Sequence, residues 1–476
     1  MRHLMAACLL LGGFVWLVRP MISSAPYSYD EADYMYAAGR GFAANYLDTP
    51  AQSFAVFLRT GLSRGQDARQ KTALSQLIRD SGDLNFYRHW HGPLYYYWLV
   101  LLQPWKADEH AVRALSMLFP ALVILVIYFG SLWVFRSESA ASAAFLAAAL
   151  YGWSVVTTVS TELAPHELFV LVSLTGLFLL VKFLETGRRS YWYTAIIATA
   201  LAIDTLEVGL ILALTLSGFA FVHRKRLHAD RFFAAKSLAL LVGSILIVWP
   251  GALFRMAIAK AYIFMAYLAV VRKAAWGATF SEAWAARGVL APVEWLLFAV
   301  ALLILITDRA LPDQTLPGQR MRDRRPMPFL VFGLLMLLFL IRVNAEGARY
   351  MLPFLPAFDV FAAITVVGWV GRHHLKAPLG MIAAACALLM LNTLRIENAR
   401  LETAPDTRPS DLIEAMRAKH LTDKTVLIPH GDFPTLHYYF PGAKLIAYGE
   451  NSEGPPSGVA ADAVVEEGSP VRIVTY

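Results

Sequence analysis

Three carboxylates lie within four residues of the sequence, at Asp30, Glu31 and Asp33, in the stretch 28–41 that reads SYDEADYMYAAGRG. This stretch follows closely on the first apolar run of the chain. A carboxylate beside apolar surroundings and other carboxylates is suited to act as a general base. The same residues also suit a helix N-terminus, because Ser28 and Glu31, or Asp30 and Asp33, have the spacing of a capping box. The two interpretations are compatible, since a cap fixes the geometry that a base requires.

A second polar group lies in the segment STELAPHELF at 160–169, which contains Glu162, His166 and Glu167. Ionisable groups so close to apolar segments are usually directed at a polar partner. The alternative is a solvated loop followed by a helix that begins after Pro165.

A third candidate is the pair His89 and His91 in the sequence RHWHGPLYYYW. Two histidines at this spacing could ligate a metal ion, with His166 or an acidic residue completing the site in space. The ligands stay unknown and no cofactor is certain, but a divalent metal ion is an open alternative.

A fourth candidate is Arg349, in the sequence VNAEGARYMLPFLPAF at 343–358, where a late apolar segment begins. A guanidinium at headgroup depth can hold a phosphate through paired hydrogen bonds. The alternative is an arginine that only extends its charge toward the membrane surface.

The composition indicates what must position these residues. Of the 476 residues, 57% are hydrophobic and 16% are charged, and the mean hydropathy is +0.50. Such a chain is a polytopic α-helical membrane protein in contact with membrane lipids. The net charge of +7 does not indicate nucleic-acid binding, because Lys and Arg lie in short loops between apolar segments. The two cysteines lie inside apolar segments, so no disulfide framework is expected.

Eleven apolar segments are expected to span the membrane. They are centred near residues 12, 125, 150, 176, 198, 215, 243, 298, 335, 360 and 386. Lys and Arg concentrate in alternate loops, which predicts a cytoplasmic N-terminus and places residues 28–33 outside. The alternative for the first segment is a cleaved signal peptide with small residues at 23–25.

The polar parts of the chain predict two domains. Residues 1–398 form a transmembrane domain, which includes a long first outer loop at 23–112 with interfacial helices. Within this loop, residues 68–78 have helical spacing, and 91–105 are apolar but too short to span. The segment 254–288 is expected to form a peripheral amphipathic helix pair.

Residues 399–476 are expected to form a small soluble extracytoplasmic α/β domain. Strands are predicted at TVLIPH (425–430), KLIAY (444–448) and VRIVTY (471–476), with helices near 409–419 and 434–440. An odd number of spans leaves this domain outside the membrane.

Four features together carry a resemblance to a known class. They are the Asp30-Glu31 pair after the first span, HGPLYYYW at 91–98, DEHAVRALS at 108–116 and RYMLPFLPAF at 349–358. They resemble the polyprenyl-phosphate-sugar-dependent membrane glycosyltransferases of the GT-C superfamily, which include protein O-mannosyltransferases and the aminoarabinose transferases of lipid A. The resemblance covers about residues 1–395, so the tail lies outside it.

The resemblance implies a GT-C-like fold in a cell inner membrane and a polyprenyl-phosphate-linked sugar as donor. It implies that Asp30 deprotonates an acceptor hydroxyl on a lipid, glycan or protein, with Glu31 beside it. His166 or Glu162 would lie in the second acidic loop, and Arg349 would contact the donor phosphate. Where relatives often have Thr-Lys, this chain has DTLEVG at 204–209, which removes a cation and leaves an atypical sugar or an altered site open.

Two other classes compete with this interpretation. A secondary transporter also has many spans and membrane-adjacent carboxylates, although transporters place ionisable groups near the midplane on broken helices. A catalytically inactive relative would act as a scaffold through residues 399–476, and it predicts that Asp30 is dispensable.

Overall fold

The computed structural model describes twelve stretches of the chain. These are residues 1–42, 91–135, 139–224, 231–252, 280–310, 325–341, 348–373, 378–402, 406–429, 431–448, 460–466 and 470–475. The chain divides into two compact units, which are described separately. The membrane unit comprises Met1–Met21, Met117–Thr161 and Pro165–Arg400, and the loop–tail unit comprises Ile22–Ser116, Glu162–Ala164 and Leu401–Tyr476.

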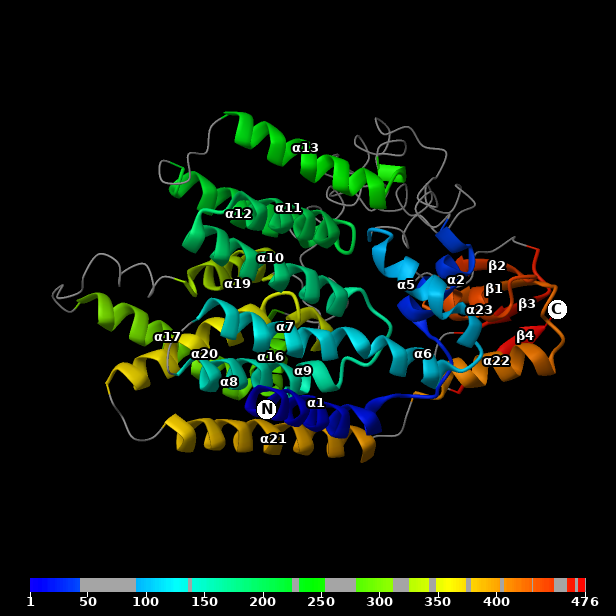
Figure 1. Cartoon of the computed structure of the whole chain (residues 1–476). Helices are drawn as coiled ribbons and strands as arrows, with labels where there is room; N and C mark the ends of the chain where they lie inside the picture. The colour runs from blue at the N-terminus through cyan, green and yellow to red at the C-terminus, as the bar shows by residue number, and fades with distance from the viewer. Residues whose placement is uncertain are drawn as a thin grey trace. The chain divides into compact units, whose positions relative to one another are not determined.

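The described residues of the membrane unit form helices joined by turns and loops, with no strand among them (Figure 1). Its α-helices are α1 (Arg2–Val18), α7 (Leu118–Val134), α8 (Ala140–Gly152), α9 (Val155–Thr158), α10 (His166–Thr186), α11 (Arg189–Ile203), α12 (Leu210–Val222), α13 (Arg231–Val248), α16 (Phe280–Leu290), α17 (Pro292–Ala310), α19 (Met327–Leu340), α20 (Leu355–Arg372) and α21 (Pro378–Glu402). Short 3-10 turns are η1 (Arg19–Met21), η5 (Glu207–Gly209) and η6 (Ala348–Met351). A helix is present at each of the eleven predicted apolar segments.

Fewer helices than eleven are long enough to cross a bilayer alone. Among the described residues, five are long and apolar enough, and a sixth counts if the bent pair Trp284–Leu290 and Pro292–Thr307 is one span. That pair bends by 94°. The bend falls at Pro292, which cannot continue a helix hydrogen-bond ladder but fits the first turn of a new helix. The chain is therefore a multi-pass membrane protein, and the exact count of eleven spans stays a prediction.

Small residues allow close helix packing in the membrane unit. The alanine-rich α8 contacts α1, α7 and α20, and α10 contacts α7 and α11. On α19, a Cβ at Gly333 would lie 2.4 Å from the Phe358 ring on α20, so only glycine fits this crossing. Such small-residue contacts are typical of membrane helices, where close backbone approach replaces the hydrophobic driving force.

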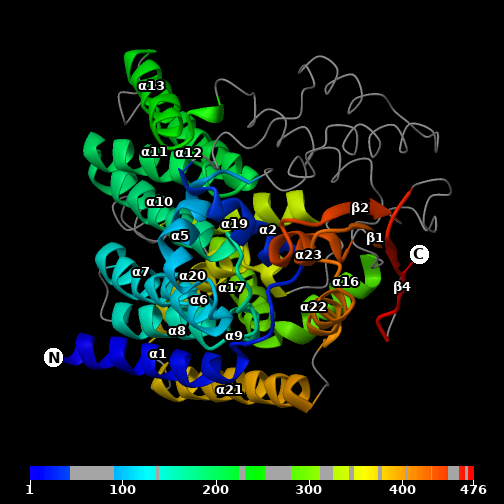
Figure 2. The same cartoon turned by 90° about the vertical axis from the view of Figure 1, so that its right-hand side faces the viewer.

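Helices α1 and α21 lie side by side in both views (Figures 1 and 2). Trp153 joins them, because its Nε1 donates to the Leu10 carbonyl at 3.1 Å and its own carbonyl accepts from Thr393 Oγ1 at 2.7 Å. Both helices expose large apolar side chains, including Leu9 on α1 and Leu391 on α21. Exposed leucines on spanning-length helices are expected where a helix faces lipid.

The loop–tail unit contains a four-stranded sheet in the order β2-β1-β3-β4. The strands are β1 (Thr425–Pro429), β2 (Lys444–Tyr448), β3 (Ala463–Val465) and β4 (Ile473–Thr475). β1 pairs in parallel with β2 and β3, while β3 and β4 are antiparallel. The helices α22 (Arg408–Ala418) and α23 (Phe433–Tyr439) complete it. The three predicted strands and both predicted helices are confirmed, whereas β3 was not predicted.

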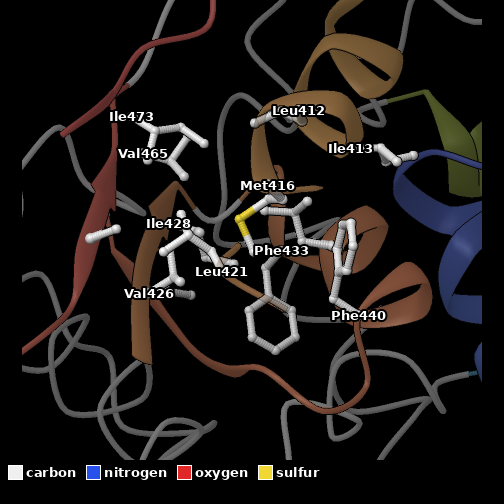
Figure 3. Close-up of a cluster of buried hydrophobic side chains, with 13 residues drawn as sticks. Leu412, Ile413, Met416, Leu421, Val426, Ile428, Phe433, Phe440, Val465 and Ile473 are labelled. Carbon is white, nitrogen blue, oxygen red and sulfur yellow. The ribbon is translucent and has the colours of Figure 1, made fainter. Parts of the chain in front are cut away.

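Alternation along β1 builds the core of this sheet. Val426 and Ile428 face a buried cluster with Met416 of α22 and Phe433 of α23 (Figure 3). Leu427 faces the opposite side of the sheet, in a second, smaller cluster. This is the period of two that a strand buried on both faces requires.

The described part of the first loop contains three short α-helices. They are α2 (Tyr29–Gly39), α5 (Leu94–Leu102) and α6 (Glu109–Ser116), and η4 (Gln103–Trp105) follows α5. The nine-residue α5 is too short to span, as predicted for 91–105. Its interfacial position stays a prediction. The predicted helix at 68–78 and residues 254–279 of the predicted helix pair lie outside the described residues.

The two compact units group the chain differently from the predicted domains, which stay a prediction. Residues 22–116 group with 401–476, whereas the prediction placed the first outer loop in the domain 1–398. The reason is packing between α2 and α23, which residue patterns along the chain cannot show. The boundary near 399 lies within α21, which runs without a break from Pro378 to Glu402.

Candidate functional site

Helix α2 begins where the sequence places the acidic trio. Ser28 is the N-cap residue, but its side chain accepts no capping hydrogen bond, and the Glu31 side chain is engaged elsewhere. The predicted helix N-terminus is confirmed, but Ser28 and Glu31 do not form a capping box. Asp30 and Glu31 lie in the first turn, where the helix dipole favours negative charge. Tyr29 has a φ of 45°, a backbone conformation that costs on the order of 1–3 kcal/mol for a bulky residue.

Glu31 forms a buried ion pair with Arg113 of α6. Arg113 Nε donates to Glu31 Oε1 at 2.9 Å, and Arg113 Nη2 donates to Oε2 at 2.6 Å. The backbone N–H of Leu163 also donates to Glu31 Oε1, at 2.9 Å. Both side chains are almost fully buried. This carboxylate therefore fixes the segment 162–164 against α2, which is a positioning role.

Arg113 holds the chain that leads into α2. Its Nη1 donates to the carbonyls of Ser23 at 2.8 Å and Ala25 at 2.7 Å. The guanidinium also lies over the Tyr27 ring, 5.3 Å from its centroid. Arg113 lies in the motif DEHAVRALS, but it was not among the predicted site residues. The sequence feature that could have identified Arg113 is its position just before an apolar segment, where an arginine usually has a polar partner.

The other predicted residues of this unit lie on or near α2. Asp30 and Asp33 are half-buried and share one face of the helix, since residues three apart are neighbours. The His91 ring lies 6.1 Å from the ring of Tyr34, also on α2. Glu162 is exposed and precedes Leu163, the residue that binds Glu31. His89 lies outside the described residues.

The membrane unit brings together the remaining candidates through Tyr350. The His166 ring meets the Tyr350 ring edge to face, with centroids 5.7 Å apart. Arg349 Nη2 donates to the Tyr350 hydroxyl at 3.1 Å. His166 from the second predicted loop and Arg349 from the late motif thus contact the same tyrosine. Neighbouring Glu167 is buried and accepts a hydrogen bond from the Tyr151 hydroxyl.

Further buried carboxylates in the membrane unit were missed by sequence reasoning. Glu294 at the start of α17 accepts a hydrogen bond from Ser154 Oγ at 2.6 Å. Asp359 of α20 is also buried and interacts electrostatically with Glu294. Both residues could have been identified from the sequence, because each is an acidic residue inside an apolar segment. Such residues usually face a polar site in the interior of the helix bundle.

Asp204 follows α11 in the segment DTLEVG, before η5. Its side chain is fully buried, and within the described residues neither carboxyl oxygen has a hydrogen-bond partner. Burial raises the pKa of Asp204 to about 9. The side chain is therefore a neutral carboxylic acid at neutral pH, and the segment DTLEVG does not carry a negative charge at Asp204.

A metal site receives no support from the described ranges. Among them, no group of three His, Cys, Asp or Glu side chains is arranged to hold a metal ion. Because His89 lies outside these ranges, the predicted metal alternative stays untested.

The fold and these residues define a class: a multi-pass helical membrane protein with polar residues gathered where helices begin and end. Residues 91–249, about a third of the chain, match the family model of the dolichyl-phosphate-mannose-protein mannosyltransferases. No curated protein matches the chain.

Two solved structures show the same fold. One is the archaeal oligosaccharyltransferase AglB from Archaeoglobus fulgidus, in complex with an inhibitory peptide and a dolichol-phosphate. It has a TM-score of 0.57 and 13% identity over 94% of this chain, and this chain spans 64% of its length. The other is ArnT from Cupriavidus metallidurans bound to undecaprenyl phosphate. It has a TM-score of 0.56 and 15% identity over 94% of this chain and 86% of ArnT.

These comparisons confirm the resemblance to the lipid-phosphate-dependent glycosyltransferases of the GT-C superfamily. The identities are low, so the likeness to the two structures concerns the fold. What this chain binds and transfers has to be argued from its own residues.

Proposed function

We propose that this protein transfers a sugar from a polyprenyl-phosphate donor to a hydroxyl acceptor at the outer face of the membrane. The observation that carries the proposal is the start of α2. Glu31 is fixed there by Arg113 and Leu163, while the adjacent Asp30 is half-buried in the first helical turn. A carboxylate held on a rigid backbone beside an ordered ion pair is suited to act as a positioned base.

The proposed reaction is a single displacement. Asp30 takes the proton of the acceptor hydroxyl as the acceptor oxygen bonds to the anomeric carbon. The bond from that carbon to the phosphate oxygen breaks, and the polyprenyl phosphate leaves, so the anomeric configuration inverts. A positioned base contributes ~10²–10⁴-fold, and orientation and charge stabilisation supply much of the rest.

Arg349 is proposed to hold the donor phosphate. Its guanidinium lies over the Tyr350 ring, 5.1 Å from the centroid, and one nitrogen donates to that hydroxyl. Tyr350 thereby orients the guanidinium, a planar group whose geometry suits phosphate oxygens. The His166 ring contacts the same Tyr350 ring edge to face. It is proposed, with Glu162 and Glu167, to shape the second-loop side of the site.

The donor chemistry follows from the proposed location. A site outside the cytoplasm has no nucleotide sugar available, so the activated sugar must arrive as a membrane-borne phosphate. The inner-membrane location, the cytoplasmic N-terminus and the extracytoplasmic position of 399–476 are parts of this proposal. The acceptor is a hydroxyl of a lipid, glycan or protein.

The test compares sugar transfer from radiolabelled polyprenyl-phosphate sugars by the intact chain and by Asp30→Asn in membranes. The substitution keeps the shape of the side chain but removes the base, so we expect transfer to fall ~10²-fold or more at equal expression. Asp33→Asn is the matched control one helical turn away. Equal transfer by the wild type and Asp30→Asn would refute the assignment.

A secondary transporter is the second candidate, and the buried carboxylates Glu294 and Asp359 on the membrane helices α17 and α20 favour it. Transport of a solute into vesicles that requires Glu294 and Asp359 but not Asp30, with no transfer from any donor, would support this class over the glycosyltransferase.

A further inference from the structure

The C-terminal helix α23 contacts the approach to α2 and α2 itself. The backbone N–H of Tyr27 donates to the Tyr439 hydroxyl at 2.9 Å, and the Tyr27 ring meets the Tyr438 ring edge to face at 5.5 Å. About two turns into α2, the Tyr36 ring lies 4.2 Å from the His437 ring. Three consecutive residues of α23 therefore contact residues that precede Asp30 in the sequence and a residue that follows it.

The Tyr439 hydroxyl makes two hydrogen bonds, one as acceptor and one as donor. It accepts from Tyr27 and donates to Glu109 Oε1 at 2.8 Å. Glu109 begins α6, and Arg113 lies one turn later on the same helix. One hydroxyl thus connects α23, the chain entering α2 and the helix that supplies the partner of Glu31. Burial and the hydrogen bond to Glu109 raise the pKa of Tyr439, so the hydroxyl keeps its proton at neutral pH.

The start of α2 needs such external support. Ser28 supplies no side-chain cap, and Tyr29 has the left-handed φ of 45°. A strained residue persists only when the surrounding structure holds it in place. The Tyr29 ring passes Gly431 at the start of the α23 segment, where a Cβ would lie 3.5 Å from ring carbon Cε1.

Helix α23 is itself anchored in the C-terminal sheet. Phe433, Leu436 and Phe440 belong to the buried cluster of Figure 3. Just before α23, Asp432 accepts from the Arg408 guanidinium at 2.9 Å on one oxygen and 2.5 Å on the other. The position of Tyr439 is therefore set by the folded α/β segment.

We infer that Tyr439 is a positioning residue through which the C-terminal α/β segment orients the first turn of α2 and hence Asp30. The inference rests on the proposed function. It assigns the C-terminal segment that contains α22, α23 and the sheet a role in the transfer reaction. Tyr439 does not contact the substrate in this role, and it acts through the backbone of residues 27–30.

The test uses the full chain with Tyr439→Phe and the matched control Tyr438→Phe. Each variant keeps its ring, but only Tyr439→Phe removes both hydrogen bonds. We expect Tyr439→Phe to lower kcat about tenfold with the donor KM unchanged, because the phosphate contacts of Arg349 remain.

We also expect faster amide exchange in residues 27–33. Glu109→Gln keeps the acceptor oxygen and should retain most of the activity.

Two readouts separate failure of the inference from failure of the proposed function. If the wild type transfers sugar and Asp30→Asn does not, yet Tyr439→Phe matches Tyr438→Phe in kcat and exchange, only the inference is overturned. If Tyr439→Phe lowers transfer by loss of folded protein, with a fall in melting temperature that Tyr438→Phe lacks and an unchanged kcat per folded molecule, the positioning role is also overturned. If the wild type transfers nothing, the proposed function is refuted. The inference that Tyr439 orients Asp30 for transfer is then refuted as well.

Discussion

The Arg113 guanidinium donates to both carboxylate oxygens of Glu31, at 2.9 and 2.6 Å, and the Leu163 N–H adds a third donor to the same group. These three donors occupy the oxygens of Glu31 and fix the orientation of its carboxylate, which suits a structural role. The structure thus favours different roles for the two adjacent acids of the motif: Glu31 positions, and Asp30 is the proposed base.

Removing one partner of this ion pair should be costly. Arg113→Ala leaves the Glu31 charge buried and is expected to lower the free energy of unfolding by about 3–5 kcal/mol. Thermal unfolding in detergent measures the loss. The control is the double variant Glu31→Leu, Arg113→Met, which removes both charges and should be more stable than Arg113→Ala. Additive losses in the double variant would contradict a coupled pair.

Arg349→Lys tests the proposed phosphate contact. Lysine keeps the charge but loses the planar fork that pairs with phosphate oxygens, so the donor KM is expected to rise about tenfold with a smaller change in kcat. Arg372→Lys, at the far end of α20, is the matched control. The measurement is transfer rate against donor concentration, and an unchanged KM for Arg349→Lys would remove this residue from the donor site.

Tyr151→Phe tests the buried hydrogen bond to Glu167. The variant leaves one oxygen of a buried acid without its donor, which is expected to cost about 1–3 kcal/mol of stability. In a Glu167→Leu background the same substitution should cost much less, because no acceptor is left unsatisfied. Equal costs in the two backgrounds, measured by thermal unfolding, would show that the hydrogen bond does not stabilise the protein.

Local pattern was sufficient to predict the helices and most of the sheet. Apolar runs predicted a helix at each of eleven places, and β-branched runs such as TVLIP predicted β1. The three-residue β3 was missed, because Ala463–Val465 is too short to show alternation. Span lengths were also not predictable, since helices such as α8 end early at short turns like the one before α9.

Pairings between distant residues could not be predicted from the sequence. Glu31 and Arg113 lie 82 residues apart, and Tyr27 and Tyr439 lie 412 apart. Their residue types allow the contacts, but only the packing of α2 against α6 and α23 selects them. The same limit explains why Asp30 and Glu31 were identified as site candidates while Arg113, the partner of Glu31, was not.

Asp204→Asn tests the buried acid in the segment DTLEVG, which follows α11. Burial raises the pKa of Asp204 to about 9, whereas an aspartate in the unfolded chain titrates near pH ~4. The folded state therefore binds more protons between these values, and the contribution of Asp204 to stability falls as pH rises through this window. Asparagine has no proton to lose, so the stability of Asp204→Asn relative to the wild type should grow from pH 4 to pH 9. The slope is at most ~1.4 kcal/mol per pH unit.

Thermal unfolding from pH 4 to pH 9 measures this slope, with Asp423→Asn at an exposed position as control. A stability difference between Asp204→Asn and the wild type that does not change with pH would mean that Asp204 is ionised in the folded protein, and a cationic partner would then have to lie beside it.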